Sequence, residues 1–336
     1  MRCCHGIAVL GGLALLALIP ALGRAGSYQA TFLVSDIPDL ALITDPSLIN
    51  PWGVSFSATS PFWVSNAGTS TATLYSGSDD TNFAKNSLVV SIPGGAPSGQ
   101  VNNSTTDFGG AHFIFAGLNG TINSWSSGTV ADLRATVPDA GYTGITMGAD
   151  SAGNNLLFAA NHRAGTIDVF DADFNLVDSG NSFIDPDLDP SFTPFNVQNI
   201  GGTVYVMYQS LDTPAQGGVV NMFDTDGNFQ GRFTNGGSLN APWGITIAPD
   251  DFGQFSNAVL VGGFGDGRIS AFDANTGAFI DFLKDDDGNP WVFDHLWTLT
   301  FGNGGSGGDP STLYFTAGIN NEQDGLFGSF TPGSDN

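Results

Sequence analysis

The chain has 336 residues, of which 41% are hydrophobic and 12% aromatic, so it can bury a large core. Its formal net charge is −24, and nearly all the acidic residues are aspartate because Glu322 is the only glutamate. Such a charge repels nucleic acid and anionic membranes, and we expect neither as a partner. The 47 glycines separate short apolar runs, and long runs of helix-forming residues are absent, which predicts an all-β fold.

Residues 1–25 have the pattern of a secretory signal peptide. Arg2 is followed by an apolar stretch over residues 7–22, and small residues at 23 and 25 precede the expected cleavage site after Ala25. An N-terminal membrane anchor is the alternative, but the apolar stretch is short for a span. Cleavage would remove both cysteines and two arginines, moving the net charge to −26 and leaving no thiol chemistry. We therefore expect a secreted, extracellular protein with no membrane span in its mature chain.

Six copies of one unit follow a strand predicted at residues 28–36. The innermost strand of each unit is predicted at 51–57, 97–103, 142–148, 194–200, 242–248 and 296–302. Glycine occupies the third position of four copies, and Asn196 and Thr298 occupy it in the other two. Glycine there would let neighbouring backbones approach closely near a crowded axis.

The remainder of each unit also repeats. A second apolar run is followed by a third that ends in an aromatic residue, and a fourth run completes most units; the aromatic residues are Tyr75, Trp125, Phe170, Phe223, Phe272 and Phe330. Four short strands in 45–54 residues are typical of a propeller blade. The sixth unit stops at its third strand. We therefore predict one six-bladed β-propeller domain over residues 26–336, with residues 28–36 as the outer strand of the last blade.

The units resemble NHL-type repeats, and residues 241–283 fit that pattern best. Residues 34–77 and 107–125 resemble an uncharacterised family of exported bacterial NHL-like β-propeller proteins. Many members of that family carry a C-terminal exosortase (PEP-CTERM) sorting signal, which this sequence lacks, so the resemblance implies release rather than surface retention. The family offers no catalytic residues to transfer, and the fold alone does not specify a function.

The loops that precede the inner strands, and those between second and third strands, should share one face of the propeller, here called the top face. Most propeller sites lie on this face or in the channel. The candidate binding residues there are Asn50, Trp52, His162, Arg163, Asn240, Trp243, Asp294 and His295. The tryptophans are suited to stacking on sugars, and core packing is the alternative.

Two kinds of metal site are conceivable from the residue types. Calcium in the channel would use Asp45, Asn50, Asn240 and Asp294, which offer hard oxygen ligands. Zinc would need His112, His162 and His295, but His112 is predicted at the opposite face. The segments 223–228 and 284–290 faintly resemble calcium loops but lack the glutamate of an EF-hand, and turn chemistry explains them better.

Two functions therefore remain open. We expect a secreted binding or interaction scaffold for an extracellular protein or polysaccharide, acting as a monomer. The alternative is a calcium- or zinc-dependent, lactonase-like hydrolase or lyase with its site at the channel mouth. The binding function is favoured because the sequence contains no cysteine in the mature chain, no nucleophile elbow and no phosphate-binding loop.

Overall fold

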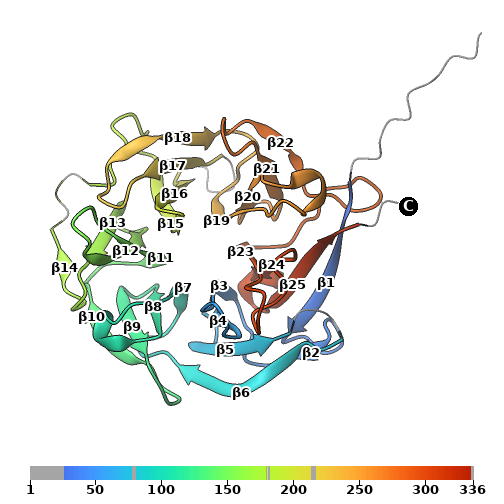
Figure 1. The fold of residues 1–336 in the computed structure, drawn as a ribbon, viewed down its shortest axis with the longest axis horizontal. Coiled ribbons are helices and arrows are strands. Elements are labelled where there is room, and N and C mark those ends of the chain that lie inside the picture. The colour runs from blue at the N-terminus through green and yellow to red at the C-terminus, as the bar shows by residue number, and fades with distance from the viewer. Residues whose placement is uncertain (1–25, 78–80, 179, 181, 213–216, 334–336) are drawn as a thin grey trace, which may run out of the picture.

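The computed structural model describes residues 26–77, 81–178, 180, 182–212 and 217–333. The predicted signal peptide, residues 1–25, lies outside the described residues. Six sheets, antiparallel except for one short parallel pair, surround one axis as the blades of a propeller (Figure 1), which confirms the predicted fold. The helix described is limited to α1 (Ile319–Glu322) and two 3₁₀ turns, Phe108–Gly110 and Gly253–Phe255.

Each blade begins with an inner strand at the predicted position and continues outward. The inner strands are β3 (Pro51–Ser55), β7 (Pro97–Asn102), β11 (Tyr142–Ala149), β15 (Phe192–Ile200), β19 (Pro242–Ile247) and β23 (Leu296–Phe301). The second strands are β4 (Phe62–Asn66), β8 (Phe113–Gly117), β12 (Asn155–Asn161), β16 (Thr203–Ser210), β20 (Val259–Gly263) and β24 (Leu313–Ala317). The third strands are β5 (Thr71–Ser76), β9 (Thr121–Trp125), β13 (Thr166–Phe170), β17 (Val219–Phe223), β21 (Ile269–Phe272) and β25 (Leu326–Pro332). The outer strands of blades 1–5 are β6 (Ala84–Ser91), β10 (Asp132–Thr136), β14 (Leu176–Val177), β18 (Phe229–Asn235) and β22 (Phe279–Phe282).

The ring closes through the N-terminal strand. β1 (Tyr28–Ser35) pairs antiparallel with β25 of blade 6, from Tyr28 opposite Pro332 to Ser35 opposite Leu326. The two-residue strand β2 (Ile43–Thr44) then adds to β1 in parallel, so blade 6 has five strands. The two ends of the described chain therefore meet in one sheet, as predicted, and the third strand of blade 6 is covered (Figure 1).

The third position of the inner strands sets how closely the blades approach. A Cβ at Gly53 would lie 2.7 Å from the carbonyl oxygen of Ser98, and one at Gly244 would lie 2.3 Å from that of Trp297. Where the repeat lacks glycine, a polar side chain bonds the next blade instead. Nδ2 of Asn196 donates to the Trp243 carbonyl at 2.8 Å, and Oγ1 of Thr298 donates to the Trp52 carbonyl at 2.7 Å.

The apolar core lies between neighbouring blades. The aromatic residue that ends each third strand is buried in five of six blades, and Phe330 belongs to the largest cluster, between blades 5 and 6. Tyr28 of β1 is buried in the same cluster, and its ring stacks on Phe255 at a centroid distance of 5.6 Å. Among the described residues, no helix is both long and apolar enough to cross a membrane.

Candidate ligand-binding face at the channel mouth

The top face is organised by one repeated backbone hydrogen bond. The residue before each inner strand accepts a hydrogen bond from the residue after the second strand of the same blade, as in Asn50 with Ala67 and His295 with Gly318. In four blades this acceptor residue has a left-handed backbone; they are Asn50, Ala96, Ala241 and His295, with φ between 47° and 51°. We call these acceptor and donor residues and their loops the mouth rim.

Aromatic side chains close the channel just inside the mouth rim. The indoles of Trp52 and Trp297 stack with their ring centroids 3.5 Å apart, and Trp243 packs edge-on against both at 6.0 Å and 5.6 Å. Phe195 and Phe264 flank Trp297 at 5.9 Å and 4.5 Å. We call these five side chains the aromatic plug. Apolar surface that would line an open mouth is thus buried within the protein.

The aromatic plug changes what the predicted sugar-stacking residues can do. Trp52 and Trp243 are only 5% and 4% exposed, so neither presents a free ring face to a ligand. Nε1 of Trp243 donates to the Thr143 carbonyl at 2.9 Å across the channel, which fixes this ring in place. Their predicted stacking on sugars is therefore replaced by core packing, the alternative interpretation of the sequence.

A small polar cavity lies along the channel below the aromatic plug. Its volume is about 50 Å³, and its walls include Gln100, Asn196, Gln198, Thr298 and Thr300. Nε2 of Gln100 donates to the carbonyls of Gly53 and Trp63, while the buried Oε1 has no partner among the described residues. A cavity of this size and polarity is suited to a few water molecules.

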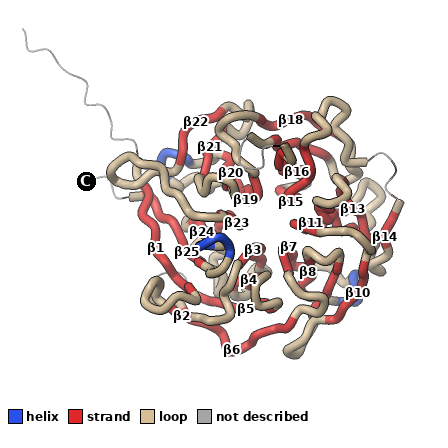
Figure 2. Tube along the Cα trace, turned by 180° about the vertical axis from the view of Figure 1, so that it is seen from behind, coloured by secondary structure: helices blue, strands red, loops and turns tan. Residues whose placement is uncertain are grey.

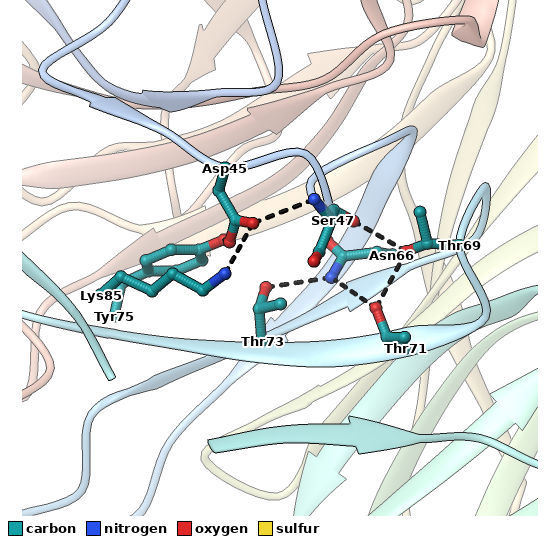
Figure 3. Close-up of polar contacts among 8 residues, drawn as sticks. All are labelled: Asp45, Ser47, Asn66, Thr69, Thr71, Thr73, Tyr75 and Lys85. Atoms are coloured by element: carbon teal, nitrogen blue, oxygen red, sulfur yellow. Dashed lines mark hydrogen bonds and ion pairs between the residues drawn. The ribbon is translucent and has the colours of Figure 1, made fainter. Parts of the chain in front are cut away.

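Asp45, a predicted calcium ligand, is committed to the fold instead (Figure 3). Its carboxylate is buried and accepts hydrogen bonds from the Tyr75 hydroxyl at 2.6 Å, the Lys85 ammonium at 2.7 Å and the Ser47 amide at 2.9 Å. Burial by itself would raise the pKa of Asp45, but the hydrogen bonds from Lys85 and Tyr75 outweigh it and lower the pKa. The carboxylate therefore stays charged and fully partnered.

The other predicted calcium ligands do not line the channel cavity either. Asn50 is buried, with Oδ1 accepting from Nε1 of Trp297 at 3.1 Å, and Asp294 accepts from the backbone of Asn321 at 2.8 Å. Asn240 has a buried Oδ1 without a partner among the described residues. None of the four candidates lines the cavity, and the described residues contain no group of three His, Cys, Asp or Glu that could hold a metal ion.

The three histidines do not lie on one face, as predicted from their places in the repeat. His162 and His295 are part of the mouth rim, whereas His112 lies at the opposite end of the β7–β8 hairpin, where its backbone bonds Asn103 and Trp125.

The two segments that resemble calcium loops, residues 223–228 and 284–290, form turns. Oδ1 of Asp224 accepts the amides of Asp226 at 3.0 Å and Asn228 at 2.8 Å, and Asp285 repeats this geometry.

Blade 6 supplies the acidic part of the mouth rim. Nδ1 of His295 lies 2.8 Å from Oδ1 of Asp294, close enough for an ion pair but out of line for a hydrogen bond. Glu322 lies in the β24–β25 loop. Burial raises the pKa of its carboxyl group, the charge of Asp294 raises it further, and the charge of His295 acts in the opposite direction. Figure 2 shows this loop, with α1, beside β23 and β3.

The backbone of this loop is unusual. Asn320, Asn321 and Glu322 are three consecutive left-handed residues, with φ of 55°, 54° and 64°. Such a conformation costs non-glycine residues roughly 1–2 kcal/mol each and tends to persist where the surroundings impose it. The hydrogen bonds from the Asn321 amide to Asp294 and from the Glu322 amide to the Gly318 carbonyl hold it here.

Blade 3 supplies the basic part of the mouth rim. His162 is half-buried, its Nδ1 lies 3.0 Å from the Pro194 carbonyl oxygen, and its ring packs 5.5 Å from Phe195 of the aromatic plug. The next residue, Arg163, is exposed and donates from Nη1 to the Ala140 carbonyl at 3.1 Å. Burial lowers the pKa of His162, and its hydrogen bond to Pro194 opposes that shift.

Sequence reasoning found His162, Arg163, Asp294 and His295 but missed two residues of the mouth rim. Phe264 packs 4.5 Å from the His295 ring, and Glu322 faces the Asp294–His295 pair. Glu322 carried a usable signal, because it is the only glutamate of the chain. Phe264 carried none, since phenylalanines occur throughout the blades.

Proteins of known sequence resemble this chain over nearly its whole length. "Uncharacterized protein R648" of Acanthamoeba polyphaga mimivirus is 33% identical over 333 residues, covering 90% of this chain and 80% of the viral protein. "Uncharacterized protein L690" of the same virus is 30% identical over 338 residues, covering 90% and 85%. No family model matches the sequence. Since these relatives are viral, they give no support to the predicted bacterial origin.

Solved structures with the same architecture are far more distant in sequence. The PQQ-bound aldose sugar dehydrogenase of Streptomyces coelicolor aligns over 92% of this chain and 99% of its own, with a TM-score of 0.53 and 13% identity. Streptogramin B lyase aligns over 93% and 99%, with a TM-score of 0.52 and 11% identity. The calcium-binding protein regucalcin of Agrobacterium tumefaciens aligns over 86% and 92%, with a TM-score of 0.52 and 14% identity. These likenesses establish the β-propeller fold and nothing finer.

Proposed function

The chain belongs to the family of the mimivirus proteins R648 and L690, and from this premise we propose that it is a secreted binding protein whose ligand docks on the mouth rim. One observation carries the proposal. The aromatic plug fills the channel mouth, so the surface left for a ligand is the rim itself, where charged side chains surround a rigid apolar centre. The ligand class that we propose is an extracellular polysaccharide or protein.

The rim has the properties expected of a binding surface. Its loops are held by the repeated hydrogen bond to the inner strands, so little conformational entropy is lost when a ligand binds. It combines opposite charges, with Arg163 on blade 3 and Asp294 on blade 6, around partly buried Leu118 and Phe264. Rigid apolar surface beside fixed polar groups is the usual composition of ligand sites.

Tryptophan fluorescence tests the proposal, because three of the six tryptophans lie in the aromatic plug directly beneath the rim. A ligand seated on the rim is expected to shift or quench the emission in a saturable way when a panel of glycans and extracellular proteins is titrated. His295→Ala should weaken this response, whereas Arg134→Gln, on the outer strand of blade 2, should leave it unchanged. If the ligand changes the fluorescence of both variants to the same extent, it binds elsewhere on the protein.

Secretion needs its own test. Expression of the full-length chain with N-terminal sequencing of the product should give Gly26 as the first residue in the medium. Retention of residues 1–25 on a membrane-bound product would favour an anchor and contradict the proposed secretion.

The metal-dependent hydrolase or lyase makes an opposite prediction. A calcium or zinc site at the mouth would stabilise the folded state by mass action, so chelation with EDTA should lower the melting temperature. Because the described residues contain no cluster of three His, Cys, Asp or Glu and none of the calcium candidates lines the channel cavity, we expect no change in melting temperature and no stoichiometric metal. If EDTA lowers the melting temperature and added calcium restores it, the metal-dependent enzyme becomes the favoured function.

A further inference from the structure

Arg163 differs from every other lysine and arginine that the structure describes. The described residues include six lysines and arginines, and five of them pair with an aspartate at 3.1 Å or less; these are Lys85, Arg134, Arg232, Arg268 and Lys284. Among the described residues, Arg163 has no carboxylate within ion-pair distance, although the chain carries 31 aspartates and a net charge of −24. An unpaired guanidinium on so acidic a protein leaves its charge free for a ligand.

The position of Arg163 is fixed by its own blade. Nη1 donates to the Ala140 carbonyl at 3.1 Å, which leaves the remaining donors of the exposed guanidinium without a carboxylate. The side chain lies against Gly141, where a Cβ would come within 2.9 Å of Nε. Gly141 is not left-handed, unlike Asn50, Ala96 and Ala241 at the same place in other blades. Its missing side chain therefore serves the placement of the arginine rather than the backbone.

His162, the residue before Arg163 in the same loop, adds a second recognition group. Because the Pro194 carbonyl can only accept, Nδ1 of His162 carries the proton of their 3.0 Å hydrogen bond. In the neutral ring Nε2 is then an acceptor that has no hydrogen-bond partner in the described part of the chain, and it is suited to a hydroxyl group. A guanidinium that recognises a planar carboxylate next to an acceptor for a hydroxyl matches a carboxylated sugar.

We propose that Arg163 and His162 form a subsite of the mouth rim that binds the carboxylate and a neighbouring hydroxyl of a uronic acid unit in an oligosaccharide. This rests on the proposed binding function and names its ligand class. The strongly negative net charge disfavours densely charged polyanions, so the favoured ligand alternates uronic acid with neutral sugars. A peptide carboxylate offers the same charge but lacks the hydroxyl.

The test is calorimetric titration of the full mature chain with a hyaluronan octasaccharide, which alternates glucuronic acid with a neutral sugar. We expect saturable binding, no binding of the carboxyl-reduced octasaccharide, and weaker binding of heparin. Arg163→Gln and Gly141→Ala should each weaken binding at least tenfold, with Arg163→Lys in between, because lysine keeps the charge but not the fork. Arg134→Gln serves as the matched control, and melting temperatures of all variants establish that they fold.

The outcomes distinguish the uronate subsite from the broader proposal that the mouth rim is the binding face. Equal affinity of the wild type and Arg163→Gln, or binding of an acidic peptide in place of the octasaccharide, would overturn the uronate subsite. If His295→Ala still weakens whichever ligand binds, the rim remains the binding face and only the subsite fails. If neither rim variant changes the affinity, binding lies elsewhere and the proposed function fails as well.

Discussion

Asp45 holds a negative charge where water has no access, and its three hydrogen-bond donors make that possible. Replacing it with alanine would leave the buried Tyr75 hydroxyl without its acceptor and the Lys85 ammonium without its counter-ion. We expect Asp45→Ala to lower the free energy of unfolding by on the order of 3 kcal/mol. Denaturant titration measures the loss. Asp132→Ala, which removes an ion pair whose side chains are 69% and 36% exposed, is the control and should cost less than about 1 kcal/mol.

Asp36 is the opposite case, a carboxyl whose charge opposes folding. Burial raises its pKa, the amide of Gly325 opposes this by donating to Oδ1 at 2.8 Å, and the charge of Asp324 adds to the rise. A carboxyl with a raised pKa contributes stability while it is protonated in both states, and this contribution is lost as the pH rises through its folded pKa. Below about pH 4 an unfolded aspartate is protonated too.

Asp36→Asn is therefore expected to stabilise the protein at pH 7 and to have little effect at pH 3. The asparagine keeps an acceptor for the Gly325 amide and removes the repulsion by Asp324. The measurement is the difference in unfolding free energy between variant and wild type from pH 3 to 8. A difference that stays constant over this range would mean that Asp36 is not destabilised by its charge.

The residue types of the mouth rim could be predicted, but their partners could not. The repeat alignment places His162, Arg163 and His295 on the top face because it fixes which loops share that face. It is silent on whether Arg163 meets a carboxylate, because a partner can come from a distant loop, as Asp45 does for Lys85 and Asp185 for Arg232. Trp52 and Trp243 show the same limit, because only the ring of blades brings them onto Trp297.

At the scale of the strand, the Pro-Trp-Gly unit is predictable because one constraint recurs in each blade. A Cβ at Gly244 would lie 2.3 Å from the Trp297 carbonyl oxygen and 2.8 Å from the Leu299 amide nitrogen, and both are backbone atoms of β23, the inner strand of the next blade. Asn196 and Thr298 stand where the other blades have glycine, and the sequence repeat does not explain why. In the structure each side chain donates a hydrogen bond to the inner strand of the next blade.

We expect Gly244→Ala to destabilise the protein by about 1–3 kcal/mol through overpacking between blades 5 and 6. Gly237→Ala is the control, because Gly237 lies in the exposed loop before the same strand, has no positive φ and has nothing near its added Cβ. That change should be neutral or slightly stabilising. Thermal unfolding of both variants gives the comparison, and equal melting temperatures would contradict the role assigned to the close approach.

At the scale of the whole molecule, stability depends on the join between the two ends. β1 covers the third strand of blade 6 over its full length, and the Gly333 amide donates to the Ser27 carbonyl at 2.7 Å. Blades 1 and 6 also contact each other directly, through the Trp52–Trp297 stack and the hydrogen bond from Thr298 to the Trp52 carbonyl. The pairing of β1 with β25 adds to these contacts by building both ends of the chain into the sheet of blade 6, from which the chain continues into blade 1. The closure was predictable from the count of strands, since the sixth unit has three and residues 28–36 were left over.

Deleting residues 26–36 should therefore destabilise the entire propeller by on the order of several kcal/mol, and not only blade 6.

A circular permutant is the control. It joins the two ends of the described chain by a short linker and opens the chain at the Gly201–Gly202 turn. Because β1 still pairs with β25, this variant should retain most of the stability. A synthetic peptide of residues 26–45 added to the deletion variant should restore a single cooperative transition by strand addition. Hydrogen exchange would separate the two possibilities: a loss of protection in all six blades follows from ring closure, whereas a loss confined to β24 and β25 would mean that the other five blades stand without it.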